Sequence, residues 1–152
     1  MALSFGVNWN ATNTASATVP MGTSMATATN QVALYEVNAG SDASADNAVK
    51  YAFFRSSARG TSSASITPNA VDQNITQAAL TTFDTAWNIN PTITASSQVL
   101  QWGMHQRATY RWVAYDYTKM IRTQAGTGKG LSLMSVVVSS AFNAVFNIQF
   151  DE

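Results

Sequence analysis

The clearest structural signal in the chain is an alternation of apolar and polar residues near its end. In residues 141–150, AFNAVFNIQF, every second side chain from Phe142 to Phe150 is apolar, and three of the four residues between them are asparagine or glutamine. Successive side chains of a β-strand point to opposite faces, so the pattern predicts a strand with one buried face and one face in water. A surface helix would instead repeat its apolar residues every three to four positions.

Similar short segments recur along the chain and favour an all-β fold. Clusters of Gly, Asn, Ser and Pro separate them, and no apolar stripe at helical spacing exceeds two turns. Residues 76–80 predict one helical turn at most, and the polar residues 56–74 are expected to form a long connection. We therefore expect an antiparallel β-sandwich with a jelly-roll-like arrangement, or a barrel. The predicted strands are residues 31–37, 49–55, 83–89, 97–102, 107–115, 131–138 and 141–150.

The first 30 residues have a different composition from the rest. No charged residue precedes Glu36, and residues 11–30 consist mostly of Ala, Thr, Asn and Ser. Ordering such a segment costs about 1–2 kcal/mol per residue in backbone entropy, and its small side chains bury little area in return. We therefore expect residues 1–30 to form an extended arm that becomes ordered on a neighbouring subunit, and residues 31–152 to form one sandwich domain. A loose N-terminal loop is the alternative.

The charge balance limits the possible partners. Eight Lys and Arg residues offset eight Asp and Glu residues, so no net field attracts nucleic acid or an anionic membrane. The chain has no cysteine, which fits synthesis in a reducing cytoplasm. The sequence contains no recognisable secretory signal and no apolar run long enough to span a membrane. We therefore expect neither export by such a signal nor a membrane-spanning segment.

Residues 105–119, HQRATYRWVAYDYTK, carry the single histidine and two arginines. The alternation within residues 107–115 predicts a strand with Tyr110 and Trp112 on its core face and Arg107 and Arg111 on its exposed face. Guanidinium groups in such positions can bind carboxylates or phosphates through two hydrogen bonds, although a solvated basic face is the alternative. The predicted core residues are Trp87, Tyr110, Trp112, Phe142, Phe146 and Ile148.

The sequence does not favour an enzyme. His105 has no G-x-S-x-G motif to accompany it, and the carboxylates are scattered rather than spaced for catalysis or metal binding. Residues 125–130, AGTGKG, depart from a phosphate loop because Thr123 stands at the first glycine position and Gly130 replaces Ser or Thr. We interpret this segment as a hairpin turn and expect no cofactor and no metal.

Three segments carry a resemblance to a known group of proteins. The run from Gln106 to Trp112, the strand GLSLMSVVVSS and the closing FNAVFNIQFDE are similar to small virion proteins encoded among the head genes of tailed bacteriophages. The resemblance covers roughly residues 49–152 and does not extend to the Thr- and Ala-rich beginning. It implies an all-β capsid-associated protein that cements or decorates a shell and has no enzymatic activity.

These observations together predict a structural protein of the virion. We expect a cement or decoration protein that is made in the host cytoplasm, binds the major capsid protein at the capsid surface and self-associates as a homo-oligomer. We expect it to bind neither membranes nor nucleic acid directly. The predicted interface residues are Arg107, Arg111 and Trp9.

Two other classes of function remain open from the sequence. A carbohydrate- or receptor-binding module would use exposed aromatic platforms, for which Trp9, Trp102 and Tyr115 are candidates. A nucleic-acid binder would use the local excess of positive charge between residues 107 and 129, in which Asp116 is the one acidic residue. The basic residues of that segment are Arg107, Arg111, Lys119, Arg122 and Lys129.

Overall fold

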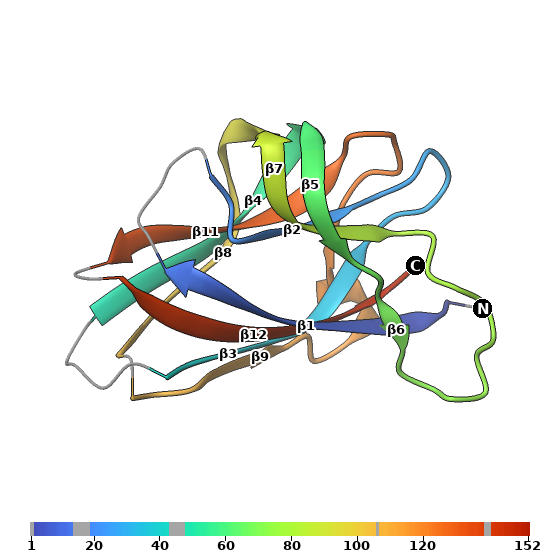
Figure 1. Ribbon diagram of the computed structural model, residues 1–152. Helices are drawn as coiled ribbons and strands as arrows, with labels where there is room; N and C mark the ends of the chain where they lie inside the picture. Colours follow the sequence, from blue (N-terminus) through green and yellow to red (C-terminus); the bar gives the residue numbers. More distant parts are fainter. Residues whose placement is uncertain (1, 14–18, 43–47, 106, 139–140) are drawn as a thin grey trace.

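Two antiparallel β-sheets packed face to face form most of the protein (Figure 1). The computed structural model describes residues 2–13, 19–42, 48–105, 107–138 and 141–152. In this part of the chain, the regular helical structure is the 3-10 turn η1 (Tyr117–Lys119), which Asp116 caps. The prediction of an all-β sandwich is confirmed at this level.

Each sheet contains six strands. Sheet A has the order β10-β3-β12-β1-β6, and β9 also pairs with β3. Sheet B has the order β5-β7-β2-β11-β4-β8. The strands of sheet A are β1 (Ser4–Asn13), β3 (Ala33–Ser41), β6 (Asn69–Ala70), β9 (Tyr110–Val113), β10 (Ile121–Arg122) and β12 (Phe142–Asp151). Those of sheet B are β2 (Gly22–Met25), β4 (Ala48–Ala58), β5 (Thr61–Ile66), β7 (Thr82–Ile89), β8 (Thr92–His105) and β11 (Gly130–Val138).

Every predicted strand overlaps an observed one, but two local predictions are wrong, those for residues 56–74 and 125–130. Residues 56–74 are not one long connection, because β4 continues to Ala58 and β5 and β6 follow. Residues 76–80, for which one helical turn at most was predicted, contain none. The turn at residues 125–130 is present, with the Lys129 amide donating to the Gly126 carbonyl at 3.0 Å, but it links β10 in sheet A to β11 in sheet B and is therefore not a hairpin.

The predicted N-terminal arm is also wrong for the residues that the structure describes. β1 lies inside sheet A, where it pairs with β12 along its whole length from Ser4 to Asn13. Its apolar side chains Phe5, Val7 and Trp9 are buried because they alternate along the strand and all face sheet B. These three residues supply the apolar area that the composition of residues 11–30 lacks. Residues 14–18 of the predicted arm lie outside the described residues.

β2 is buried for a different reason, which is the small size of its residues. The strand lies between β7 and β11, and all its residues are buried. A Cβ atom at Gly22 would lie 2.6 Å from Phe83 Cζ and 2.9 Å from Trp9 Cζ2. Glycine therefore lets the backbone of sheet B approach the aromatic rings that fill the space between the sheets.

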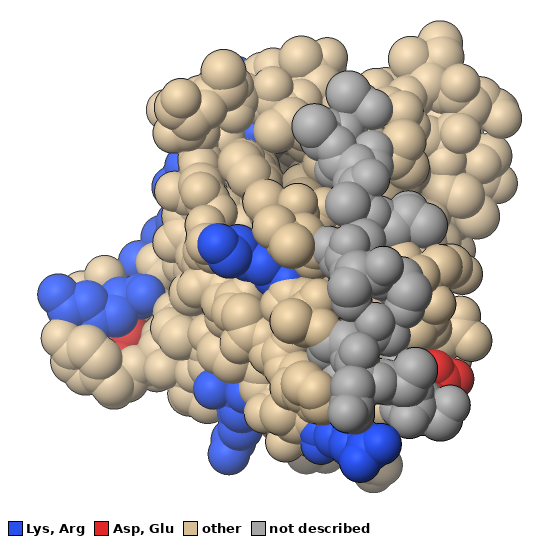
Figure 2. Space-filling view, turned by 90° about the vertical axis from the view of Figure 1, so that its left-hand side faces the viewer, with Lys and Arg blue, Asp and Glu red and all other residues tan. Residues whose placement is uncertain are grey.

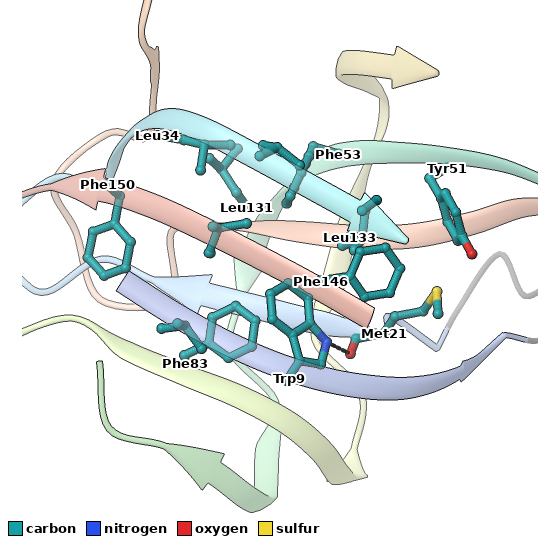
Figure 3. Close-up of a cluster of buried hydrophobic side chains, with 14 of the residues drawn as sticks. Trp9, Met21, Leu34, Tyr51, Phe53, Phe83, Leu131, Leu133, Phe146 and Phe150 are labelled. Carbon is teal, nitrogen blue, oxygen red and sulfur yellow. Dashed lines mark hydrogen bonds between the residues drawn. The ribbon is translucent and has the colours of Figure 1, made fainter. Parts of the chain in front are cut away.

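Aromatic rings at the centre of the core join the two sheets (Figure 3). Trp9 packs between Phe83 and Phe146, with ring-centre distances of 4.5 and 5.1 Å. Its Nε1 donates a hydrogen bond to the Met21 carbonyl oxygen at 2.9 Å, so the one polar atom of the ring is satisfied in the interior (Figure 3). The Tyr51 ring meets Phe146 edge-on at 5.2 Å.

The predicted core residues are distributed between the centre and the margin of this cluster. Phe146 and Ile148 are fully buried, as predicted. Tyr110, Trp112 and Phe142 are half-buried and pack against the outside of the cluster, and Trp87 is also half-buried. The marginal position of Tyr110 and Trp112 follows from their strand, because β9 is short and lies at the edge of sheet A.

Candidate interface on the outer face of sheet A

A row of polar side chains crosses the outer face of sheet A. Asn8 on β1 stands opposite Asn147 on β12, Asn147 stands opposite Asn38 on β3, and Asn38 stands opposite Arg111 on β9. Residues in register on neighbouring strands project from the same face of the sheet. The residues beside them in sequence, such as Trp9 and Phe146, point into the core. We call Asn8, Asn147 and Asn38 the amide row.

Hydrogen bonds connect the whole row. Asn147 Nδ2 donates to Asn8 Oδ1 at 2.7 Å, and Asn38 Nδ2 donates to Asn147 Oδ1 at 3.2 Å. The second bond of Asn38 Nδ2 goes to Glu36 Oε1 at 2.9 Å. A side-chain amide carries two donor hydrogens and two acceptor lone pairs, so each member of the row keeps hydrogen-bonding capacity for a partner.

An ion pair ends the row at β9. Arg111 Nε donates to Glu36 Oε1 at 2.9 Å. The hydrogen bond from Asn38, and then that from Arg111, lower the pKa of the Glu36 carboxyl below its ordinary value of 4.5, so Glu36 is ionised at neutral pH. The Glu36 side chain is 13% exposed and that of Arg111 is 67% exposed. Most of the guanidinium surface is therefore accessible to a partner.

A shallow groove runs beside the row, with a volume of about 360 Å³. Amide groups from β1, β3 and β12 line it on one side, and Tyr110 and Thr109 line it toward β9. Tyr110 stands opposite the buried Ala39, so its ring lies on the core side of β9, where it stacks on Trp102 of sheet B with ring centres 4.7 Å apart and planes inclined by 6°. The groove therefore offers mainly the neutral hydrogen-bonding groups of the amide row, beside Arg111.

The predicted interface residues do not form one site. Arg111 lies on the exposed face of β9, as predicted. Arg107 lies before β9, in a turn in which the Ala108 amide donates to the His105 carbonyl at 2.8 Å. The two arginines therefore do not share a strand face, and the prediction of alternating positions on one strand is wrong. Gln106, between His105 and Arg107, lies outside the described residues.

Trp9 is not an interface residue on this chain, because it is 5% exposed and fills the centre of the core. Trp102, another predicted aromatic platform, is also 5% exposed and packs between Tyr51, Phe53 and Tyr110. Tyr115 is exposed, at 80%. Trp9 and Trp102 were both named as candidate exposed platforms, but both lie on strand faces that turn inward.

The residues that sequence reasoning missed are the asparagines of the row. Asn147 was assigned to the outer face of its strand, but Asn8 was placed in the predicted arm and Asn38 carried no prediction. The available signal was the position of each asparagine beside a buried apolar residue on its strand. Their alignment depends on the register of β1, β12 and β3, which no single segment contains.

The surface charge of the molecule is sparse. In the view of Figure 2, Lys and Arg side chains stand in separate groups, and most of the described surface carries neither acidic nor basic residues. Arg111 is already paired with Glu36, which reduces the local positive excess that would support nucleic-acid binding. The outer face of sheet A therefore resembles a neutral, hydrogen-bonding protein interface more than a positively charged nucleic-acid-binding surface.

The described residues also limit the other classes of site. Among them, no group of three His, Asp or Glu side chains is arranged to hold a metal ion. No helix in the same ranges has the length and apolar character needed to cross a membrane. Comparison with family models, curated proteins and solved structures found no match to the chain.

Proposed function

We propose that the chain is a structural virion protein that binds the surface of a phage capsid and stabilises it as a cement or decoration protein. The strand order carries this proposal. One sheet contains the sequence β1-β12-β3-β9, and the other contains β2-β11-β4-β8. This nested pairing of early with late strands is what a jelly roll would require, with β5, β6 and β7 as an insertion, and it supports the proposal of a jelly-roll-like fold. Jelly rolls recur in viral capsid domains and in lectins.

The proposed partner is the major capsid protein, and the proposed contact is the amide row with Arg111. The row offers hydrogen-bond donors and acceptors without net charge. Its end on β1 is Asn8, which is hydrogen-bonded to Asn147, and beside its other end is the Glu36–Arg111 ion pair. Hydrogen bonds across an interface fix register and orientation, at about one per 100–200 Å² of contact. Attachment through such a face would add contacts that expansion or internal pressure must break before the shell fails.

We also propose self-association through sheet B. β8 is an edge strand of this sheet and contains no charged residue from Thr92 to His105. An uncharged edge strand exposes unpaired backbone groups that can pair with another chain. A second copy could therefore extend sheet B, while the outer face of sheet A stays available to the shell.

The experiment compares two matched variants on particles that lack the protein. Asn8→Asp with Asn147→Asp places negative charge in the centre of the row, whereas Asn88→Asp with Asn90→Asp makes the same chemical change at the exposed end of β7. Bound protein is measured against the major capsid protein after sedimentation. We expect binding of the row variant to weaken by about tenfold or more, and binding of the β7 variant to match the wild type.

A folding control distinguishes a variant that has lost the binding contact from one that no longer folds. Two carboxylates in register repel each other, so Asn147→Ala is tested beside the charged variant, and circular dichroism verifies the strand content of all of them. Full occupancy of both row variants through a heat challenge of the particles would contradict the proposed contact.

The groove beside the row favours one second candidate, a recognition module for carbohydrate. Amide groups can bind sugar hydroxyls, and the side-chain amides of Asn8, Asn38 and Asn147 lie together at this groove. Binding of the free protein to immobilised glycans, abolished by Asn38→Ala and unaffected by Asn88→Ala, would favour this candidate. If Asn38→Ala also left capsid attachment unchanged, the groove would serve carbohydrate binding rather than attachment.

A further inference from the structure

A second hollow, separate from the amide row, lies between elements of the two sheets and has a volume of about 500 Å³. Arg55 and Ser56 on β4 line one side, and Thr94 on β8 lies beside them. Arg122 on β10 and Lys129, just before β11, complete the wall. Because β4 and β8 belong to sheet B and β10 belongs to sheet A, the hollow forms only when both sheets are in place. We call it the basic cavity.

The cavity has positive charge without a balancing carboxylate. Three of its lining residues are Arg or Lys, and none is Asp or Glu. Within the residues that the structure describes, the ion pairs involve Arg59 and Arg111 and none of these three cations. All three are half-buried, so water screens their mutual repulsion less than it does on an open surface. An anion in the cavity would relieve this repulsion.

Backbone carbonyls hold both guanidinium groups in position. Arg55 Nη1 donates to the Arg122 carbonyl oxygen at 2.5 Å. Arg122 Nη2 donates to the Tyr117 carbonyl oxygen at 2.7 Å, and its guanidinium lies 4.0 Å from the centre of the Tyr117 ring. Tyr117 lines a separate hollow, so the Arg122 guanidinium is directed away from the basic cavity and its backbone carbonyl serves to fix Arg55. A guanidinium has five donor hydrogens, so Arg55 keeps donors for a ligand. Side chains that are fixed before binding lose less conformational freedom when the ligand arrives.

We propose that the basic cavity binds a small polyvalent oxyanion of the phosphate class, either free or as the phosphates of a nucleotide. A phosphate group carries about −1.5 to −2 at neutral pH and presents three strong acceptor oxygens, which suit the Arg55 guanidinium and the Lys129 ammonium better than the single charge of a carboxylate does. The site is separate from the amide row and does not depend on capsid attachment.

Isothermal titration calorimetry on the full chain at low salt tests the ligand class. The probes are sodium pyrophosphate, inorganic phosphate, a nucleoside triphosphate, a DNA oligonucleotide and, for comparison, acetate. We expect one pyrophosphate to bind per chain and to bind more tightly than acetate by about tenfold or more. Equal affinity for pyrophosphate and the nucleotide identifies a free anion as the ligand, whereas tighter binding of the nucleotide identifies a phosphate group on a larger molecule.

Two variants locate the site. Lys129→Gln should weaken pyrophosphate binding by about tenfold, whereas Lys50→Gln, which removes the same charge from an exposed position on β4, should change it by less than about twofold.

Three results would overturn the proposal. The first is no heat of binding with pyrophosphate at millimolar concentrations. The second is an equal loss of affinity in Lys50→Gln and Lys129→Gln, because that would indicate a general charge effect. The third is binding of a DNA oligonucleotide as tightly as pyrophosphate, because a backbone that spreads its charge along a strand does not require an enclosed cavity.

Discussion

The two faces of sheet A consist of the same strands but differ in what they contribute. On β1, Val7 and Trp9 point into the core, and Asn8 between them points outward to the amide row. Burial of a large apolar side chain stabilises a protein by about 1.5–3 kcal/mol, whereas a hydrogen bond contributes about 0.5–1.5 kcal/mol net. The inner face therefore holds the fold, and the outer face can change to suit a partner without loss of the fold.

The same division is visible on β12, where Phe146 is buried and Asn147 is half-exposed. Because side chains alternate along a strand, adjacent residues differ completely in environment. Substitutions at neighbouring positions thus provide a direct test of the comparison between the faces.

The largest effect is expected from Trp9→Ala. The substitution removes a ring that contacts Phe83 and Phe146 and leaves the Met21 carbonyl without its donor, so we expect a loss of about 3–5 kcal/mol in the free energy of unfolding. Asn8→Ala, one residue away, should cost less than about 1 kcal/mol. Denaturant unfolding followed by fluorescence and circular dichroism measures both. Similar losses at the two positions would remove the distinction between the faces.

A smaller effect is expected from Gly22→Ala, which adds one carbon to the inner face of sheet B. The new Cβ would lie within 2.6 Å of Phe83 Cζ and 2.9 Å of Trp9 Cζ2, so the rings must shift. Overpacking of this kind costs about 1–3 kcal/mol. Gly103→Ala is the control, because its Cβ would meet nothing nearer than the Val49 carbonyl oxygen at 3.8 Å. A melting temperature of Gly22→Ala equal to that of Gly103→Ala would contradict the close packing of the two sheets.

The smallest effect is expected from acid titration of the outer face. The pKa of Glu36 is lowered in the folded chain by Asn38 and Arg111, so its contribution to stability is complete above its ordinary value of 4.5 and is lost as pH falls through the lower folded value. Because Arg111 is mostly exposed, we expect less than about 1 kcal/mol.

Thermal unfolding of the wild type and of Glu36→Gln between neutral and acidic pH checks this titration. The wild type should be the more stable at neutral pH, and the difference should shrink below pH 4.5. A difference that stays constant with pH would mean that the charge of Glu36 does not contribute.

The strands whose own residues carry the signal could be predicted from the sequence. β12 was recognised by its alternating Phe and Ile residues, and β1 contains the same alternation in Phe5, Val7 and Trp9. The sequence analysis nevertheless assigned β1 to an arm, because the prediction followed the composition of residues 11–30 rather than the alternation of apolar residues before them. β2 is different, because its burial depends on Phe83 and Trp9, which lie on other strands.

The candidate sites were less predictable than the strands. Arg111 was identified because its exposure follows from the alternation within β9. The amide row requires the registers of β1, β12, β3 and β9, and the basic cavity requires three strands from two sheets. Those registers follow from long-range pairing, which the local pattern of one segment does not contain.

The pairing of distant strands has a consequence for how the chain reaches its fold. β12 lies between β1 and β3, and β11 lies between β2 and β4, so both sheets are joined by strands from residues 130–151. The Ser4–Asp151 hydrogen bond spans 147 positions in the sequence. Chains with such distant contacts must close long loops before the contacts stabilise them, so they fold slowly, over milliseconds to seconds.

Until β11 and β12 dock, the strands of residues 4–58 lack the neighbours that separate and cover them. Their unpaired edges and the rings of Trp9 and Phe53 are then open to other copies of the chain. Refolding yield should therefore fall as protein concentration rises, and a chaperone that shields these early strands would act on the chain before its outer faces exist.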